Sequence, residues 1–187
     1  MNSMSKGYYD SCGKERRKEE KQCPTIIKCG CPSTVTLPVV TTGSTDVVLA
    51  SLTVDTSCIC DPVIKLDFSS AFTTTATAVL GGVTVQIFKQ CRNQTTAVPV
   101  GPSWPVIGLI AAGALTGSIF TNFSICDTDA CGEECCTYTA VATVSGTALA
   151  VIGATFNNST LTSTITCRSN ACTRDCNRRR CHCECDY

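Results

Sequence analysis

Short runs of β-branched and aromatic residues alternate with polar residues along most of the chain. Residues 83–90, for example, read VTVQIFKQ, in which apolar and polar positions alternate with a period of two. This period places successive side chains on opposite faces of an extended strand. Ten such runs predict strands at residues 25–31, 33–40, 46–54, 63–68, 83–90, 104–111, 118–125, 136–144, 148–156 and 159–167.

Gly, Pro, Asn or Asp separates most of the ten runs, and no run has a convincing helical period. Short strands at this spacing predict an all-β protein, built as an antiparallel β-sandwich or jelly roll. The longest apolar stretch, residues 106–120, is interrupted by glycine and is too short to cross a bilayer. We expect two buried strands and a turn there, and no insertion into a membrane.

Composition divides the chain into three parts. Residues 1–31 are polar and charged and predict a flexible N-terminal connector that carries cysteines. Residues 32–167 form the predicted β-sandwich body, and residues 168–187 are a tail rich in cysteine and arginine. The first 21 residues lack the apolar segment of a secretory signal, so we expect export without a classical signal peptide.

The predicted body carries hydroxyl groups where most proteins carry charges. Of its 136 residues, 26 are threonine and only 11 are charged. Charged residues, lysine above all, are what normally prevent exposed strand edges from pairing with other chains. The composition therefore favours a subunit that assembles with copies of itself.

The chain contains 17 cysteines, which indicates either an oxidising final location or a metal cluster. Because 17 is odd, at least one thiol bonds outside the chain or stays unpaired. Cys12 and Cys23 are the leading candidates for interchain bonds, because a flexible arm can reach a neighbouring subunit. The alternative is that both pair within the chain or stay reduced. Cys29 and Cys31 follow them at the end of the arm.

The tail offers a possible metal site. Its ligand candidates are Cys172, Cys176, Cys181, His182, Cys183 and Cys185. Closely spaced thiolates of this kind can converge on one zinc or copper ion. The three consecutive arginines at residues 178–180 lack an aromatic platform or a recognition helix, so we expect no nucleic-acid binding. No other cofactor is indicated.

Catalysis has little support in the sequence. The only histidine, His182, lies in the tail, so a Ser-His-Asp or Cys-His arrangement within the body is excluded. Asp127 and Asp129 are close enough to act as an acid and base pair, but CDTDACGEECC is rich in turn-forming residues. We therefore expect no enzymatic activity.

Several segments suggest a family: GYYDSCGKE, IIKCGCPSTVTLP, ASLTVDTS, QIFKQCRNQTTAVPVGPSW and CGEECCTYTAVATV. In these the chain resembles a Cys-rich family of unknown function from spore-forming clostridia. More distantly, its layout is similar to the endospore appendage subunits of bacilli. Those subunits have a jelly-roll body, a Cys-bearing connector and sheets that extend one another between neighbours. The Cys-rich tail departs from their pattern.

The resemblance implies a resistant fibre on the spore or cell surface, made of one kind of subunit and covalently linked. Cys12 or Cys23 would act in the connector, and the receiving thiols at strand ends would be Cys58, Cys60, Cys91 or Cys136. Such proteins reach the surface when the mother cell lyses, which needs no signal peptide.

The sequence is also compatible with two other functions. The same residues would serve a spore coat or exosporium protein that crosslinks into a layer, in company with other spore-surface proteins. A metal-binding protein with reduced thiols is the second alternative.

Overall fold

The alternating runs form β-strands in the computed structural model, which describes residues 24–38, 40, 42–56, 59, 62–74, 81–92, 94–107, 117–128, 135–147 and 154–167. In these residues the strands are β1 (Ile26–Cys29), β2 (Ser33–Thr36), β3 (Thr42–Asp55), β4 (Pro62–Thr74), β5 (Gly81–Cys91), β6 (Val98–Ile107), β7 (Gly117–Asp127), β8 (Cys135–Thr147) and β9 (Ala154–Cys167). No helix that could span a membrane occurs in the described ranges.

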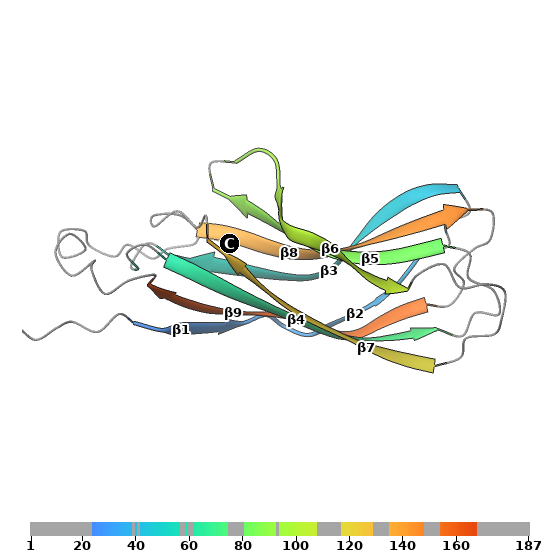
Figure 1. Ribbon diagram of the computed structural model, residues 1–187, viewed down its shortest axis with the longest axis horizontal. Helices are drawn as coiled ribbons and strands as arrows, with labels where there is room; N and C mark the ends of the chain where they lie inside the picture. The colour runs from blue at the N-terminus through green and yellow to red at the C-terminus, as the bar shows by residue number, and fades with distance from the viewer. Residues whose placement is uncertain are drawn as a thin grey trace, which may run out of the picture.

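The strands make two antiparallel sheets that pack face to face (Figure 1). The first sheet has the order β1-β9-β4-β7, with β2 also pairing to β9. The second has the order β3-β8-β5-β6. Most strands that follow one another in sequence lie in different sheets, as in a jelly roll. The prediction of an all-β, jelly-roll-like sandwich is confirmed.

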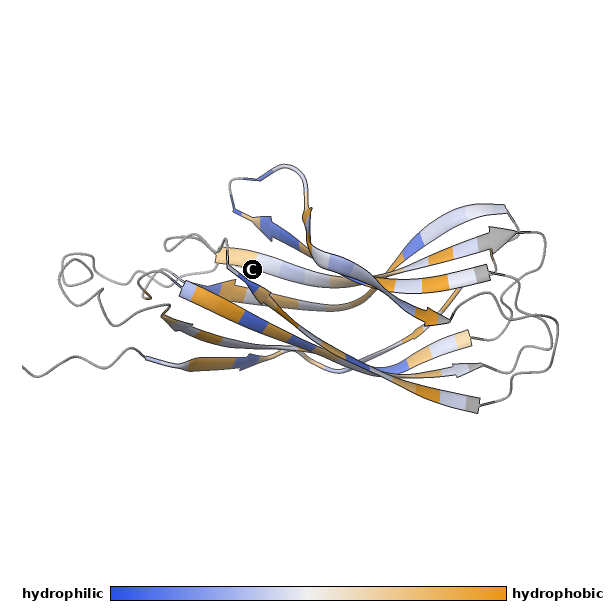
Figure 2. Ribbon diagram, viewed as in Figure 1, coloured by the Kyte–Doolittle hydropathy of each residue, from blue (hydrophilic) through white to orange (hydrophobic). Residues whose placement is uncertain are grey.

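Apolar side chains from both sheets fill the space between them. On β5, Val83, Val85 and Ile87 are fully buried, and the residues between them are partly exposed. The same alternation appears along several strands as orange bands separated by pale or blue ones (Figure 2). Each fully buried side chain of this size contributes about 1.5–3 kcal/mol to folding.

Aromatic rings close the sandwich on the side where β6 and β7 meet. Trp104 of β6 stacks on Phe123 of β7, with 4.0 Å between ring centroids and 9° between ring planes. Phe123 also packs on Phe68 of β4, at 5.1 Å. Gly101 lets β6 approach, because a Cβ at this residue would lie 1.7 Å from Cδ1 of Ile125. Its φ of +71° also favours glycine.

Two predicted strand boundaries are wrong for identifiable reasons. The runs at residues 148–156 and 159–167 were expected to be separate strands, but residues 154–167 form the single strand β9. The break in the pattern is a bulge, at which Asn158 adopts a φ of 53° and the register with β4 shifts. Strand β6 begins at Val98, before the predicted start at residue 104, and contains three prolines. An edge strand tolerates proline because one side of its backbone needs no partner.

The N-terminal boundary of the body also differs from the prediction. Residues 1–31 were assigned to a flexible connector, but the strand predicted at residues 25–31 is present as β1, which pairs with β9 from Ile26 to Cys29. Ile26 is partly buried and packs against the core, opposite Ile165. The folded body therefore includes the last part of the predicted arm.

Candidate assembly site

Three cysteine thiols are free and exposed in the described part of the chain: Cys29, Cys31 and Cys126. Cys29 is the last residue of β1, and Cys31 follows two residues later. Cys126 lies near the end of β7, directly opposite Lys65 of β4. Cys29 and Cys31 were predicted from the sequence as crosslinking candidates, whereas Cys126 was not. Its outward position could have been inferred from the alternation of SIFTNFSIC.

The free thiols belong to opposite edges of the first sheet. Cys29 pairs with Thr162 of β9, Thr162 pairs with Asp67 of β4, and Asp67 pairs with Ser124 of β7. Three strand spacings of this kind amount to about 14 Å. A disulfide requires Cα atoms within roughly 7 Å. Cys29 and Cys126 of one chain are therefore too far apart to bond to each other.

Gly30 fixes the position of the Cys29 and Cys31 thiols. Its amide donates to the carbonyl of Leu161, at 2.9 Å. A Cβ on Gly30 would lie 2.9 Å from that oxygen and 3.1 Å from the carbonyl oxygen of Ser51 in β3. Only glycine fits between the backbones of the two sheets without a shift. The thiols on either side of it are thus held at the edge of the sandwich.

Cys91 and Cys136 form a disulfide within the chain, which corrects their prediction as interchain candidates. They are direct partners in the β5–β8 register. The amide of Arg92 donates to the carbonyl of Cys135, at 3.1 Å, so Cys91 and Cys136 occupy a non-hydrogen-bonded pair. Side chains approach most closely at such pairs. Both residues are buried, so neither sulfur is available to a neighbour.

The structure accounts for the remaining cysteines, predicted candidates or not, only in part. Cys135 and Cys167, at the start of β8 and the end of β9, are also disulfide-bonded. Cys12, Cys23, Cys58 and Cys60 lie outside the described residues, as does the whole predicted metal site at Cys172, Cys176, Cys181, His182, Cys183 and Cys185. Within the residues that the structure describes, no three His, Cys, Asp or Glu side chains gather as a metal site.

Strand β7 presents the least protected edge of the sandwich. From Gly117 to Cys126 it contains no charged residue and no proline. Two large apolar side chains on it are solvent-exposed, Ile119 to 40% and Phe120 to 77%. Both were expected to be buried, but β7 is the outermost strand of its sheet. A long, uncharged edge strand is a ready template for pairing with another chain.

The other two long edge strands, β6 and β3, differ from β7 in their prolines, charged residues and register. Strand β6 is interrupted by Pro99, Pro102 and Pro105, which removes backbone donors. Strand β3 has 14 residues without proline, and it carries Asp46 and Asp55 and a register shift after Val48. In the jelly-roll order, β3 lies at the opposite end of the sandwich from β7 and in the other sheet.

Hydroxyl groups cover both outer faces. Thr36 and Thr155 lie 3.3 Å apart (Oγ1 to Oγ1) on the first sheet, and Thr53 and Thr137 lie 3.2 Å apart on the second. Cross-strand pairs of this kind stabilise a sheet by roughly 0.2–1 kcal/mol each. The predicted hydroxyl-covered surface is therefore present on the strands.

A small charged cluster lies on the outer face of β4. The Nζ of Lys65 lies 2.7 Å from Oδ1 of Asp67, and the hydroxyl of Ser124 donates to the same oxygen. These hydrogen bonds hold the pKa of Asp67 below its ordinary value of 3.8, and the one from Lys65 has the larger effect. Asp67 is therefore ionised at neutral pH.

The aspartate considered for catalysis, Asp127, forms a buried ion pair. Its Oδ2 lies 2.9 Å from Nζ of Lys89 and accepts a hydrogen bond of 2.6 Å from the hydroxyl of Tyr138. Lys89 and Tyr138 are register partners in the second sheet, so the cluster joins the two sheets. The three side chains satisfy one another's charge and hydrogen-bonding capacity. The cluster therefore has a structural role. Asp129 lies outside the described residues.

Two solved structures share this arrangement of strands. The structure of infectious bursal disease virus Gx strain matches with a TM-score of 0.51 and 12% sequence identity, over 78% of this chain and 32% of that one. The Gt strain structure matches with a TM-score of 0.52 and 11% identity, over 75% of this chain and 33% of that one. The chain thus spans about a third of each viral chain. At this identity the likeness establishes the fold alone.

The family comparison covers the folded body. No curated protein matches the sequence. A family model described as a domain of unknown function, DUF4489, matches residues 23–166, which include every strand from β1 to nearly the end of β9. The chain therefore belongs to the DUF4489 family.

Proposed function

We propose that this protein is a structural subunit that assembles with copies of itself into a resistant fibre, extracellular or on the spore surface. The observation that carries the proposal is the placement of free, exposed thiols at opposite edges of one sheet. Cys29 and Cys126 cannot bond to each other within one chain, but they can link successive copies. The function is mechanical and protective, and it includes no enzymatic activity.

Main-chain pairing supplies the non-covalent contact in this proposal. Strand β7 of one copy adds to the edge of the next copy, and β3 is the partner edge best suited to it. Because β7 and β3 are different surfaces, the contact is heterologous. A heterologous contact that does not close into a ring produces an open filament. Main-chain hydrogen bonds across such an edge set the register between subunits.

Disulfides make the assembly permanent. In our proposal, Cys126 of one copy bonds to Cys29 or Cys31 of another, and Cys12 and Cys23 add connector bonds to further subunits. Once the edges are paired, the thiols are held close together, which raises their effective concentration. A covalent polymer cannot dissociate, so the larger gain is kinetic rather than thermodynamic.

Electron microscopy of natively purified protein tests the proposal. Fibres of constant width that shorten only after reduction and mild denaturation would support it. A featureless crosslinked layer would favour the spore-coat alternative, because the same thiols would then link subunits without a repeated edge contact. Isolated particles of single-subunit size would exclude both.

A further inference from the structure

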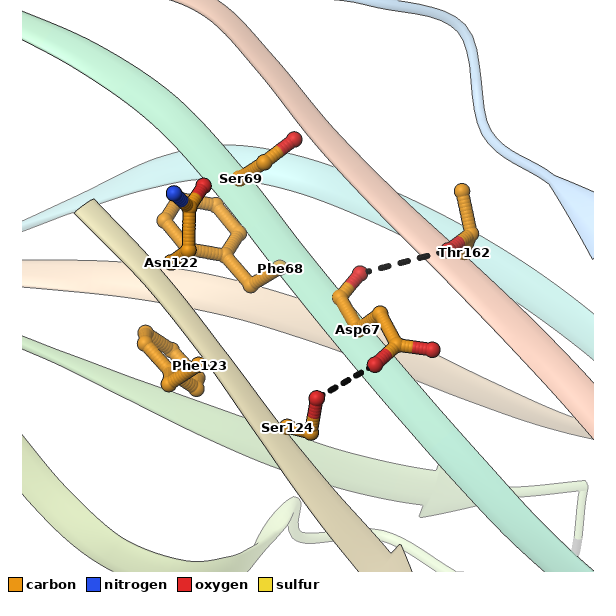
Figure 3. A pocket seen from close by; sticks show the side chains of 7 residues that line it. All are labelled: Asp67, Phe68, Ser69, Asn122, Phe123, Ser124 and Thr162. Atoms are coloured by element: carbon orange, nitrogen blue, oxygen red, sulfur yellow. Dashed lines mark hydrogen bonds between the residues drawn. The ribbon is translucent and has the colours of Figure 1, made fainter. Parts of the chain in front are cut away.

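A shallow depression of about 480 Å³ lies on the outer face of the first sheet, where β9, β4 and β7 run side by side (Figure 3). The polar side chains that line it are Asp67, Ser69, Asn122, Ser124 and Thr162. They come from three adjacent strands and lie in two register rows, Thr162–Asp67–Ser124 and Ser69–Asn122. The depression is therefore part of a rigid surface.

Several of these groups have hydrogen-bonding capacity left over. Oδ1 of Asp67 accepts from Ser124 and Lys65, but Oδ2 has no partner among the described residues. The hydroxyl of Ser69 and the amide of Asn122 make no hydrogen bond within the same ranges. A carboxylate oxygen, a hydroxyl and an amide thus offer acceptors and donors to one ligand.

An exposed aromatic ring extends this surface at one end. Phe120 lies on the same face of β7 as Asn122, two residues earlier, and is 77% exposed. Its register partner on β4 is Ala71, whose methyl group leaves the ring uncovered. The exposed ring provides an apolar face beside the polar groups of the depression, which a ligand with both apolar and polar surface can cover.

We propose that this depression binds a neutral oligosaccharide. A sugar ring presents hydroxyl donors and acceptors at its edge, which match Asp67, Ser69 and Asn122. Its axial C–H groups form an apolar face, which matches the ring of Phe120. The depression falls within the volume range of small-ligand sites.

Other ligand classes fit the surface poorly. An anion would meet the carboxylate of Asp67, and the nearby cation, Lys65, is already paired with that carboxylate. An apolar ligand would have to desolvate the hydroxyl, amide and carboxylate groups without replacing their hydrogen bonds. A neutral polyol avoids both costs.

The sugar site goes beyond the proposed assembly and does not depend on it. It uses outward side chains, whereas assembly uses the backbone edge of β7 and the thiols. In a polymer the site would be repeated along the surface, so weak individual binding would become strong by multivalency.

Isothermal titration calorimetry of the full-length protein tests the proposal, with cellohexaose and the β-1,4-linked hexamer of N-acetylglucosamine as separate probes. Saturable binding of either sugar supports the site, and the stronger ligand identifies the preferred ring substituent. Phe120→Ala and Asp67→Asn should each weaken binding by about tenfold or more. Val48→Ala is the matched control, because Val48 is 57% exposed but lies on the other sheet, and it should bind as the unmodified protein does.

The fold of each variant can be followed through Trp104, the only tryptophan in the chain. Its ring stacks on Phe123, just beneath the depression, so an unchanged emission spectrum indicates an intact site. The proposal is overturned if neither hexasaccharide binds at millimolar concentration. It is also overturned if both Phe120→Ala and Asp67→Asn bind as strongly as the unmodified protein.

Discussion

Cys29 and Cys126 carry free thiols on the same sheet, but two strands, β9 and β4, separate them. The separation of about 14 Å is twice what a disulfide spans. In contrast, Cys91 and Cys136 are direct register partners and are bonded to each other. The fold thus separates thiols that stabilise the subunit from thiols that can join subunits.

Replacing both Cys91 and Cys136 with alanine should weaken the subunit but leave its assembly intact. The disulfide closes a sequence separation of 45 residues, and the chain-entropy estimate for such a loop is about 4 kcal/mol. Chemical denaturation of the double variant under reducing and non-reducing conditions measures this loss. Crosslinked species should still form in the double variant, because its free thiols at Cys29, Cys31 and Cys126 are unchanged. Loss of crosslinking with retained folding would show that Cys91 and Cys136 serve assembly instead.

Removing Asp127 should destabilise the sandwich severely. In Asp127→Ala, the buried Lys89 loses the carboxylate that lies 2.9 Å from its Nζ, and breaking a buried pair in this way costs about 3–5 kcal/mol. The matched control is Lys65→Ala, which breaks an ion pair of similar length whose side chains are 51% and 36% exposed. Exposed pairs contribute about 1 kcal/mol or less. Equal losses of unfolding free energy in the two variants would contradict this account.

The strand pattern was predictable from sequence because most strands bury only one face. Along β5, Val83, Val85 and Ile87 alternate with polar residues, and the period of two is visible in the sequence. The start of β6 was not predictable in this way. Its prolines suggest interruptions between strands, and only the sheet order shows that β6 lies at an edge where proline is tolerated.

The long-range features could not be read from the chain. The pairing of Cys91 with Cys136 depends on the register of β5 against β8, and no local pattern specifies it. The ion pair of Lys89 with Asp127 was partly predictable from the sequence, because Lys89 occupies an inward position between Ile87 and Cys91. Its partner Asp127 comes from the other sheet, so burial of a lysine could be suspected but its counter-charge could not be named.

The pKa of Asp67 should depend on Lys65. The hydrogen bond from Lys65 is the largest cause that lowers this pKa, and that from Ser124 is the second. Because the folded-state pKa is lowered, the stabilisation by this carboxylate is present above the ordinary value of 3.8 and is lost as pH falls through the lower folded value. In a carbon-detected NMR titration, Lys65→Met should shift the midpoint of Asp67 upward, and Ser124→Ala should shift it by less. An unchanged midpoint in Lys65→Met would contradict the assignment.

A charge on the edge of β7 should stop non-covalent assembly. Ile119→Lys places a cation at the inward-facing side of the edge strand, a device that blocks strand pairing. We expect the variant to remain monomeric in light scattering under reducing conditions, and we expect the unmodified protein to associate under the same conditions. Val98→Lys on β6 is the control, because that residue is similarly exposed, at 41%, on an edge that proline already protects. Association that persists in Ile119→Lys would assign the contact to another edge.

The central claim is that separate copies are joined by disulfides, and electrophoresis tests it most directly. Natively isolated protein is alkylated at once, boiled in detergent and run with and without reductant, beside a variant in which Cys29, Cys31 and Cys126 are serine. We predict a ladder, or material too large to enter the gel, that collapses with reductant to a band near 19.7 kDa. The ladder should be shorter in the variant, which keeps only the remaining cysteines. A clean monomer without reductant in the unmodified protein would contradict the covalent polymer.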